Sequence, residues 1–199
     1  ACFPEMPPMV GYASTATFRS NAPPGEGDVY SDINKQAEAF NDIPGPPVVV
    51  FQDLDDPPAA ATFGEVMCTT YQTCGAKGIV TSGAGRDLDQ VRAIGFPAFT
   101  TGTICAHGDC HITAVHVPVH VGGITVYPGD LLHGDCNGVT TIPNEIAADV
   151  AHACADLVAA EEVALNYLKG GSVTPEGLAD SRAECKRLID ELRARVAKK

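Results

Sequence analysis

The sequence has no apolar run that approaches the roughly 20 residues a membrane-spanning helix needs. Its first ten residues, ACFPEMPPMV, lack both the basic and the apolar stretch of a secretory signal. Basic residues are scarce, since 13 Lys and Arg face 25 Asp and Glu, and the net charge of -12 opposes binding to nucleic acid or anionic lipid. We therefore expect a cytoplasmic protein that binds neither membrane nor nucleic acid. Ala1 in place of an initiator Met favours a processed or truncated N-terminus.

The eight cysteines form no C-x-x-C pair, and their spacing does not resemble a disulfide framework or a zinc ribbon. The sequence contains no internal repeat and no low-complexity tract. With 199 residues, of which 45% are hydrophobic and 19% charged, the chain is long enough to bury one substantial core. We expect a single domain that spans residues 1–199.

The first half of the chain predicts alternating strands and helices, which is typical of an α/β fold. Apolar runs bounded by turn residues indicate the strands, and apolar residues at helical spacing indicate the helices. The expected strands are 11–18, 48–51 and 78–83, and the expected helices are 32–40, 59–75 and 85–95.

The second half has two different patterns. From 111 to 143 apolar and polar residues alternate, and Gly-Gly, Pro-Gly and Asn-Gly pairs interrupt them, which indicates antiparallel strands. Two long helices are then expected, from about 144 to 168 and from about 175 to 196. Thr174 fits the N-cap of the second helix, and Pro175 fits its first position.

The most informative block for chemistry runs from Gly64 to Gln90. Gly64 opens a helix whose free N–H groups favour an anion, and the next strand ends in SGAGRD. Ligands of α/β sheets collect where strands end and helices begin, so these two segments are expected to meet at one crevice. Arg86 offers a two-pronged donor for a carboxylate, and Asp87 offers a hard oxygen ligand for Mg²⁺ or Mn²⁺. This pairing suits a metal-bound oxo-acid such as pyruvate or oxaloacetate.

Four motifs occur in order: GEVM, SGAGRD with its Arg twenty-two residues after Gly64, FPAF with TGT, and VPVHVGGITVYPGDLLHGDCNGVTTIP. Together they resemble the RraA-like family, which includes the 4-hydroxy-4-methyl-2-oxoglutarate aldolases and the regulators of ribonuclease E activity. The resemblance covers roughly Val10 to the C-terminus. It implies an α/β domain of the swivelling β/β/α type, with a sheet flanked by helices and a C-terminal helical pair, which assembles as a homotrimer or a hexamer.

The resemblance also implies a set of site residues. Asp87 matches the family's metal ligand, and Arg86 matches the residue that holds the oxo-acid and stabilises its enolate. The backbone amides of one segment match the cradle for the substrate carboxylate: Gly64, Glu65, Val66 and Met67.

Two acidic residues complete the implied site. Glu65 stands twenty-one positions before the Arg, where the family's aldolases carry an acid that holds metal-bound water and the regulators tend to have glycine. A glutamate from the long C-terminal helix of a neighbouring subunit acts through water as well. Glu162 is the match, with Glu161 as the alternative.

The implied function is that of a metal-dependent class II (pyruvate) aldolase or oxaloacetate decarboxylase, which cleaves small 4-hydroxy-2-oxo-acids through a metal-stabilised enolate. Its cofactor would be Mg²⁺ or Mn²⁺. The alternative is a non-catalytic regulator that binds a protein partner such as an RNA-processing enzyme. Two positions depart from the family pattern: Gln90 replaces an acid that many members carry, and Gly85 replaces a branched apolar residue.

Other readings of these residues remain open. An Arg-Asp pair is often a surface salt bridge or a helix cap, and Glu65 would suit the first turn of any helix. The CAHGDCH segment, Cys105 to His111, could bind zinc or shape the substrate mouth. Within it, His107 carries an imidazole, a side chain that could relay protons near the site.

Overall fold

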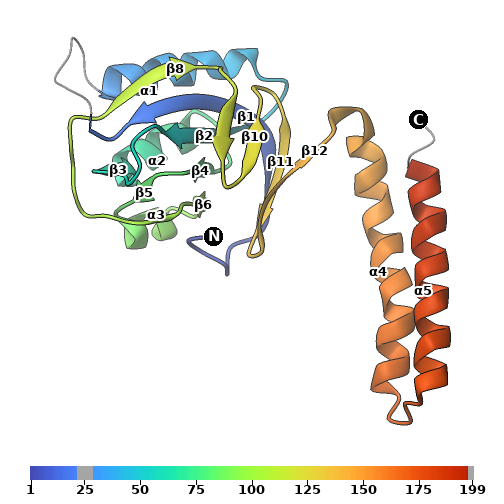
Figure 1. Ribbon diagram of the computed structural model, residues 1–199. Coiled ribbons are helices and arrows are strands. Elements are labelled where there is room, and N and C mark those ends of the chain that lie inside the picture. Colours follow the sequence, from blue (N-terminus) through green and yellow to red (C-terminus); the bar gives the residue numbers. More distant parts are fainter. Residues whose placement is uncertain (22–28, 197–199) are drawn as a thin grey trace. The chain divides into compact units, whose positions relative to one another are not determined.

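The computed structural model describes residues 1–21 and 29–196 (Figure 1). Contacts divide the chain into two compact units, Ala1–Ile142 and the residues from Pro143 onward. The first unit is a mixed α/β structure with a curled sheet, and the second consists of helices. The expected fold class, an α/β domain with a C-terminal helical pair, is therefore confirmed.

The main sheet of the first unit is built around β1 (Met9–Arg19). One half of β1 pairs with β11 and the other half with β8, both antiparallel, while β2 lies parallel along its other edge. In the described residues the strand order is β12-β11-β1-β2-β4-β6, with β8 off this path. The remaining strands of this sheet are β2 (Pro47–Asp53), β4 (Ile79–Thr81), β6 (Ala98–Phe99), β8 (His111–Val115), β11 (Leu131–Asp135) and β12 (Gly138–Ile142).

Both faces of β2 are buried, which explains its unbroken apolar sequence. Val49 and Phe51 belong to one core cluster, and Val48 and Val50 belong to a second cluster on the other face. The first cluster also takes up the buried side of α2 (Glu65–Thr73), where Tyr71 is fully buried. The other helices of this unit are α1 (Val29–Glu38), which continues as a 3₁₀ helix (Ala39–Asp42), and α3 (Leu88–Ala93).

A second, smaller sheet consists of three short parallel strands, β3 (Ala61–Phe63), β5 (Ala84–Gly85) and β7 (Gly102–Thr103). The antiparallel hairpin of β9 (Val119–Val121) and β10 (Ile124–Val126) turns at Gly122 and Gly123. Both glycines have positive φ, which other residues rarely adopt. The antiparallel section expected from residue 111 onward is therefore confirmed.

Two helix predictions were wrong at their starts. The helix expected over 59–75 begins only at Glu65, because residues 61–63 pair with β5 as a strand and Gly64 is fully extended. The helix expected over 85–95 begins at Leu88, because Gly85 ends β5 and Asp87 adopts a left-handed conformation. In both places a short strand and a turn replace the first helical turn.

The second unit contains a 3₁₀ turn (Asn144–Ile146) followed by α4 (Ala147–Lys169) and α5 (Pro175–Val196), which pack against each other. The Thr174 hydroxyl accepts a hydrogen bond from the Gly177 amide at 3.1 Å, so the predicted N-cap is confirmed. Among the described residues no helix is long and apolar enough to cross a membrane.

A buried polar pair ties three elements of the first unit together. The Tyr71 hydroxyl on α2 donates to Gln36 Oε1 on α1 at 2.6 Å, and Gln36 Nε2 donates to the Ser14 carbonyl of β1 at 3.2 Å. Gln36 is fully buried, so its amide depends on these partners.

Tyr71→Phe is expected to lower the free energy of unfolding by about 1–3 kcal/mol, because the buried Gln36 oxygen loses its donor. Urea unfolding followed by circular dichroism measures the change. The control is Tyr127→Phe, since Tyr127 is 55% exposed, and it should shift the unfolding midpoint by much less. Equal stability of the two variants would contradict the role given to this pair.

Candidate functional site

The three parallel strands of the small sheet bring three distant segments of the chain together. Ala61 pairs with Ala84 and Ala84 with Gly102, so the carboxyl ends of β3, β5 and β7 lie side by side. The chain leaves β3 into α2, leaves β5 into Arg86 and Asp87, and leaves β7 into the segment 104–110. The expectation that the Gly64 and SGAGRD segments meet at one crevice agrees with this topology.

Asp87 has an unusual backbone conformation. Its φ of 55° and ψ of 38° lie in the left-handed region, which costs a non-glycine residue roughly 1–2 kcal/mol. Although Asp87 occupies the N-cap position of α3, its carboxylate does not cap that helix. Instead Oδ2 accepts the Glu65 amide at the start of α2 at 3.0 Å. Residues held in such conformations cluster at functional sites, so Asp87 is a candidate functional position.

Gly64 allows Arg86 and Asp87 to approach the start of α2. A Cβ atom at Gly64 would lie 2.6 Å from Asp87 Oδ2 and 3.0 Å from Arg86 Nε. These two side chains form a loose ion pair at 3.9 Å, and about a third of each is exposed (31% and 34%). They are therefore accessible to a small ligand while the surrounding protein fixes their position.

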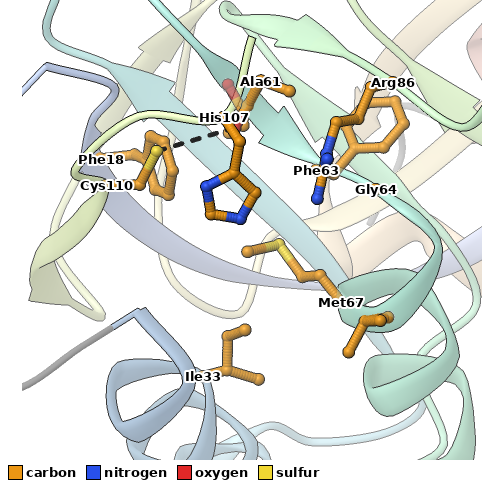
Figure 2. Close-up of a pocket in the computed structure, with 11 residues that line it drawn as sticks. Phe18, Ile33, Ala61, Phe63, Gly64, Met67, Arg86, His107 and Cys110 are labelled. Atoms are coloured by element: carbon orange, nitrogen blue, oxygen red, sulfur yellow. Dashed lines mark hydrogen bonds between the residues drawn. The ribbon is translucent and has the colours of Figure 1, made fainter. Parts of the chain in front are cut away.

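Arg86 of this ion pair lines a pocket (Figure 2). Gly64, Val66, Met67 and Arg86 line it, whereas the Glu65 and Asp87 side chains are not part of its lining. The sequence did not indicate several lining residues that come from β1, α1 and β3: Phe18, Ile33, Ala61, Thr62 and Phe63. Cys110, from the segment that could bind zinc or shape the substrate mouth, lines the pocket as well. His107 also lines the pocket, and the sequence had suggested it only as a proton relay.

The structure explains why residue 85 can be a glycine where the family pattern has a branched apolar residue. A Cβ atom at Gly85 would lie 2.3 Å from the ring of Phe63, which is buried on the neighbouring strand β3. The ring therefore fills the space that a branched side chain at 85 would take. The Arg86 amide donates to the Phe63 carbonyl at 3.0 Å, so Arg86 remains fixed to β3 in spite of the glycine before it.

The buried carboxyl group of Asp53 contacts a residue that lines the pocket. Asp53, at the end of β2, accepts hydrogen bonds from the Asp55 amide at 3.0 Å and from the Ser20 hydroxyl at 3.3 Å. Thr62, which lines the pocket, donates to the other Asp53 oxygen at 3.5 Å. Burial raises the pKa of Asp53, and the hydrogen bonds from Asp55 and Ser20 oppose this shift.

The residues of the CAHGDCH segment point in different directions. Cys105 is exposed, Cys110 is buried with its thiol near the Ser20 and Ala61 carbonyls, and His111 lies 3.7 Å from Asp32. Among the described residues no group of three or more His, Cys, Asp or Glu side chains converges as a metal site. For Asp87, this means that water and substrate would have to complete the coordination of an ion.

Two further predicted residues lie elsewhere. Gln90 is exposed on α3 and is not among the residues that line the pocket. Glu162 and its alternative Glu161 are exposed on α4 in the second unit. Their roles remain predictions.

Comparison with known proteins identifies the family of the chain. Residues 1–141 match the RraA-like family, described as Aldolase/RraA. The chain belongs to the RraA-like family. This confirms the resemblance on which the predicted site rests.

One relative is named as a putative aldolase and another as a member of an RNase inhibitor family. Over 136 residues the chain is 38% identical to the "Putative 4-hydroxy-4-methyl-2-oxoglutarate aldolase" of Halalkalibacterium halodurans, covering 68% of this chain and 60% of that protein. It also resembles the crystal structure of Streptomyces coelicolor RraAS2, an unusual member of the RNase ES inhibitor RraA protein family. That match has a TM-score of 0.63 and 27% identity, and it covers 79% of this chain and 76% of the other.

A third match is the structure of an uncharacterized protein from Pseudomonas syringae pv. tomato. Its TM-score is 0.68 at 25% identity, and it covers 89% of this chain and 76% of the other. These comparisons establish an RraA-like fold for the chain and leave both an aldolase and a regulator as possible functions of the family.

Gly64→Ala is expected to push the Asp87 carboxylate away from the Glu65 amide. The loss of that hydrogen bond should lower the free energy of unfolding by about 0.5–1.5 kcal/mol and speed hydrogen exchange at the Glu65 amide. Gly102→Ala is the control, because a Cβ atom there would meet nothing within 4 Å. Unchanged exchange at Glu65 in the Gly64 variant would show that the close approach has no structural consequence.

Proposed function

We propose that the protein is a divalent-metal-dependent pyruvate aldolase that also decarboxylates oxaloacetate, with its reaction centre at Arg86 and Asp87. The observation that carries the proposal is the left-handed Asp87, whose carboxylate faces the start of α2 beside the Arg86 guanidinium. Small 4-hydroxy-2-oxo-acids are the substrates. The relative named as an aldolase supports this choice.

The residues present fit a divalent cation. In the described structure the hydrogen bond and the ion pair of the Asp87 carboxylate both use Oδ2, so Oδ1 is available as a hard oxygen ligand. Mg²⁺ and Mn²⁺ commonly bind through one or two carboxylates together with water and substrate. When bound at Asp87, the ion would polarise the 2-oxo group of the substrate. Glu65, exposed at the start of α2, would hold water beside it.

The start of α2 and Arg86 recognise the oxo-acid. The first amides of a helix lack acceptors within the helix, and its positive end favours an anion. The Glu65 amide already donates to Asp87, so within the segment from Gly64 to Met67 the amides of Val66 and Met67 suit the substrate carboxylate. The Arg86 guanidinium adds positive charge where the 2-oxo oxygen becomes an enolate oxygen. Phe63 and Met67 give the pocket an apolar side, which strengthens these electrostatic contacts by excluding water.

Arg86→Ala and Asp87→Asn are each expected to lower kcat/KM about 10²–10³-fold, as the loss of a charge-stabilising group commonly does. Pyruvate formation from 4-hydroxy-4-methyl-2-oxoglutarate and from oxaloacetate is measured. Arg92→Ala and Asp89→Asn are matched controls on α3, since both side chains are exposed, and they should retain activity. Equal turnover by the site and control variants would refute the assignment.

Metal dependence has a separate test. Chelation should abolish pyruvate formation, and Mg²⁺ or Mn²⁺ should restore it. Asp87→Asn should weaken Mn²⁺ binding, followed by the paramagnetic resonance of the free ion, at least tenfold, whereas Arg86→Ala should bind Mn²⁺ like the unmodified protein. Full turnover after complete chelation would exclude a metal-dependent reaction.

The second unit supports the proposal of an oligomer. On α4 the exposed apolar residues Val158, Leu165 and Leu168 recur at intervals of seven and three, which places them on one face of the helix. Glu161 and Glu162 lie within one turn of Val158. We propose a homotrimer or hexamer in which this face packs against another copy and brings Glu162 to its site, so that residues 1–199 act as one RraA-like domain.

Val158→Glu is expected to dissociate the assembly, because it places a charge within the apolar face. Size-exclusion chromatography with light scattering gives the molar mass. Ala179→Glu adds the same charge at an exposed position of α5 and should leave the mass unchanged. A monomeric unmodified protein would refute the proposed oligomer without bearing on Arg86 or Asp87.

A non-catalytic regulator is the second candidate, favoured by the likeness to the Streptomyces RraA protein. The two candidates give different results in one experiment. A regulator would bind an RNA-processing enzyme equally well with Asp87→Asn and without added metal, and it would form no pyruvate from either substrate.

A further inference from the structure

The segment between β7 and β8 carries a histidine into the candidate pocket. His107 lies among the lining residues, and Figure 2 shows its imidazole and the Arg86 guanidinium directed into the same space from different segments. This segment follows β7 just as α2 follows β3 and Arg86 follows β5. Each strand of the small parallel sheet therefore contributes one part of the pocket at its carboxyl end.

Contacts on both sides of His107 fix the backbone of this segment. Before it, the Ile104 amide donates to the Gly85 carbonyl at 3.1 Å, and the Ala106 carbonyl accepts the Ala61 amide at 3.0 Å. After it, a Cβ atom at Gly108 would lie 2.8 Å from the Ser20 carbonyl oxygen, so only glycine fits this approach. The protein thus holds the segment in place and directs the His107 side chain toward the pocket.

Among the lining residues that the structure describes, His107 is the side chain suited to carry a proton in both directions. A guanidinium group such as that of Arg86 has hydrogen-bond donors and no acceptor, so it does not serve as a base. The Cys110 thiol is held at the Ser20 and Ala61 carbonyls, and burial raises its pKa. Imidazole can accept and donate a proton near neutral pH.

We propose that His107 is a catalytic residue that transfers the proton during aldol cleavage; this inference rests on the proposed function. The neutral imidazole removes the proton of the 4-hydroxyl group, and the electrons of that O–H bond form the new carbonyl. The C3–C4 bond breaks, and its electron pair moves into the enolate of pyruvate. The imidazolium then donates the same proton to C3, which completes pyruvate and restores neutral His107.

Decarboxylation provides a comparison that separates His107 from the rest of the site. Oxaloacetate forms the same enolate when CO₂ leaves, but no proton has to be removed first. Water can protonate the enolate that results. Arg86 and the metal ligand are therefore required for both reactions, whereas a proton-transferring histidine is required only for aldol cleavage.

The test compares His107→Asn with the unmodified holoenzyme in three reactions: pyruvate release from 4-hydroxy-4-methyl-2-oxoglutarate, exchange of the pyruvate methyl protons with D₂O, and CO₂ release from oxaloacetate. The first two rates should fall about 10²–10⁴-fold, the usual contribution of general acid–base catalysis, and the third should change less than threefold. His120→Asn, an exposed histidine on β9 outside the pocket, should keep all three rates.

Three other outcomes would each contradict either the role of His107 or the proposed function. Unchanged cleavage and exchange in His107→Asn would overturn the role of His107 and leave the proposed function standing. Loss of CO₂ release together with the other two reactions would also overturn it, since it would assign His107 a structural role. Absence of all three reactions in the unmodified protein would refute the proposed function itself.

A binding measurement supplies a readout that does not depend on turnover. Oxalate, a mimic of the pyruvate enolate, should shift the ring signals of His107 in ¹H–¹⁵N spectra, where His107→Asn identifies them. His107→Asn should bind oxalate with less than a threefold loss of affinity, because Arg86 and α2 hold the carboxylates. Unshifted His107 signals in the oxalate complex would overturn the proposal.

Discussion

The site depends on the hydrogen bond between the Asp87 carboxylate and the Glu65 amide. This bond spans two chain segments that leave neighbouring parallel strands, β3 and β5, and it joins the turn after one strand to the helix after the other. Two glycines make it possible, because a side chain at Gly64 would meet the carboxylate and a side chain at Gly85 would meet the Phe63 ring. The positions of Arg86 and of the α2 amides follow from this close approach.

The small parallel sheet also explains why the pocket combines residues so distant in sequence. Strands of two or three residues contribute little stability of their own, and here they pack against the buried core of the first unit through Phe63. Their pairing aligns the three carboxyl ends. The start of α2, the Arg-Asp pair and the histidine segment then lie beside one another, and contacts such as the Glu65–Asp87 and Ile104–Gly85 hydrogen bonds fix them there.

The sequence predicted the parts of the site that depend on local chemistry. Gly64 before a helix and an Arg-Asp pair after a strand are local signals, and the parallel topology made their meeting predictable. Phe18 and Ile33 could not be predicted, because only the packing of β1 and α1 brings them to the pocket. The strand at 61–63 was missed for a similar reason: three residues carry no periodicity, and their pairing with β5 outweighs the helical spacing around them.

Gly85 shows how a departure from a family pattern can be misread from sequence alone. A glycine there would leave room for Arg86 to move if nothing else filled the space, yet the Phe63 ring fills it and the Phe63 carbonyl holds the Arg86 amide. The compensating residue lies twenty-two positions earlier in the chain, on the neighbouring strand. Pairwise packing across the sheet, rather than the identity of one residue, determines whether the arginine is held.

The division of the site into two halves has a chemical consequence. Arg86, Asp87 and the start of α2 come from the β3 and β5 segments and suit the charge of an oxo-acid and its enolate, which aldol cleavage and decarboxylation share. His107 comes from the segment after β7, and only aldol cleavage needs the proton it would carry. In the proposed mechanism, a change at His107 would therefore slow aldol cleavage and leave the decarboxylation of oxaloacetate, which needs only the groups that hold the oxo-acid and its enolate. The two activities would then depend on different strands of the small sheet, aldol cleavage on the segments after β3, β5 and β7, and decarboxylation on those after β3 and β5.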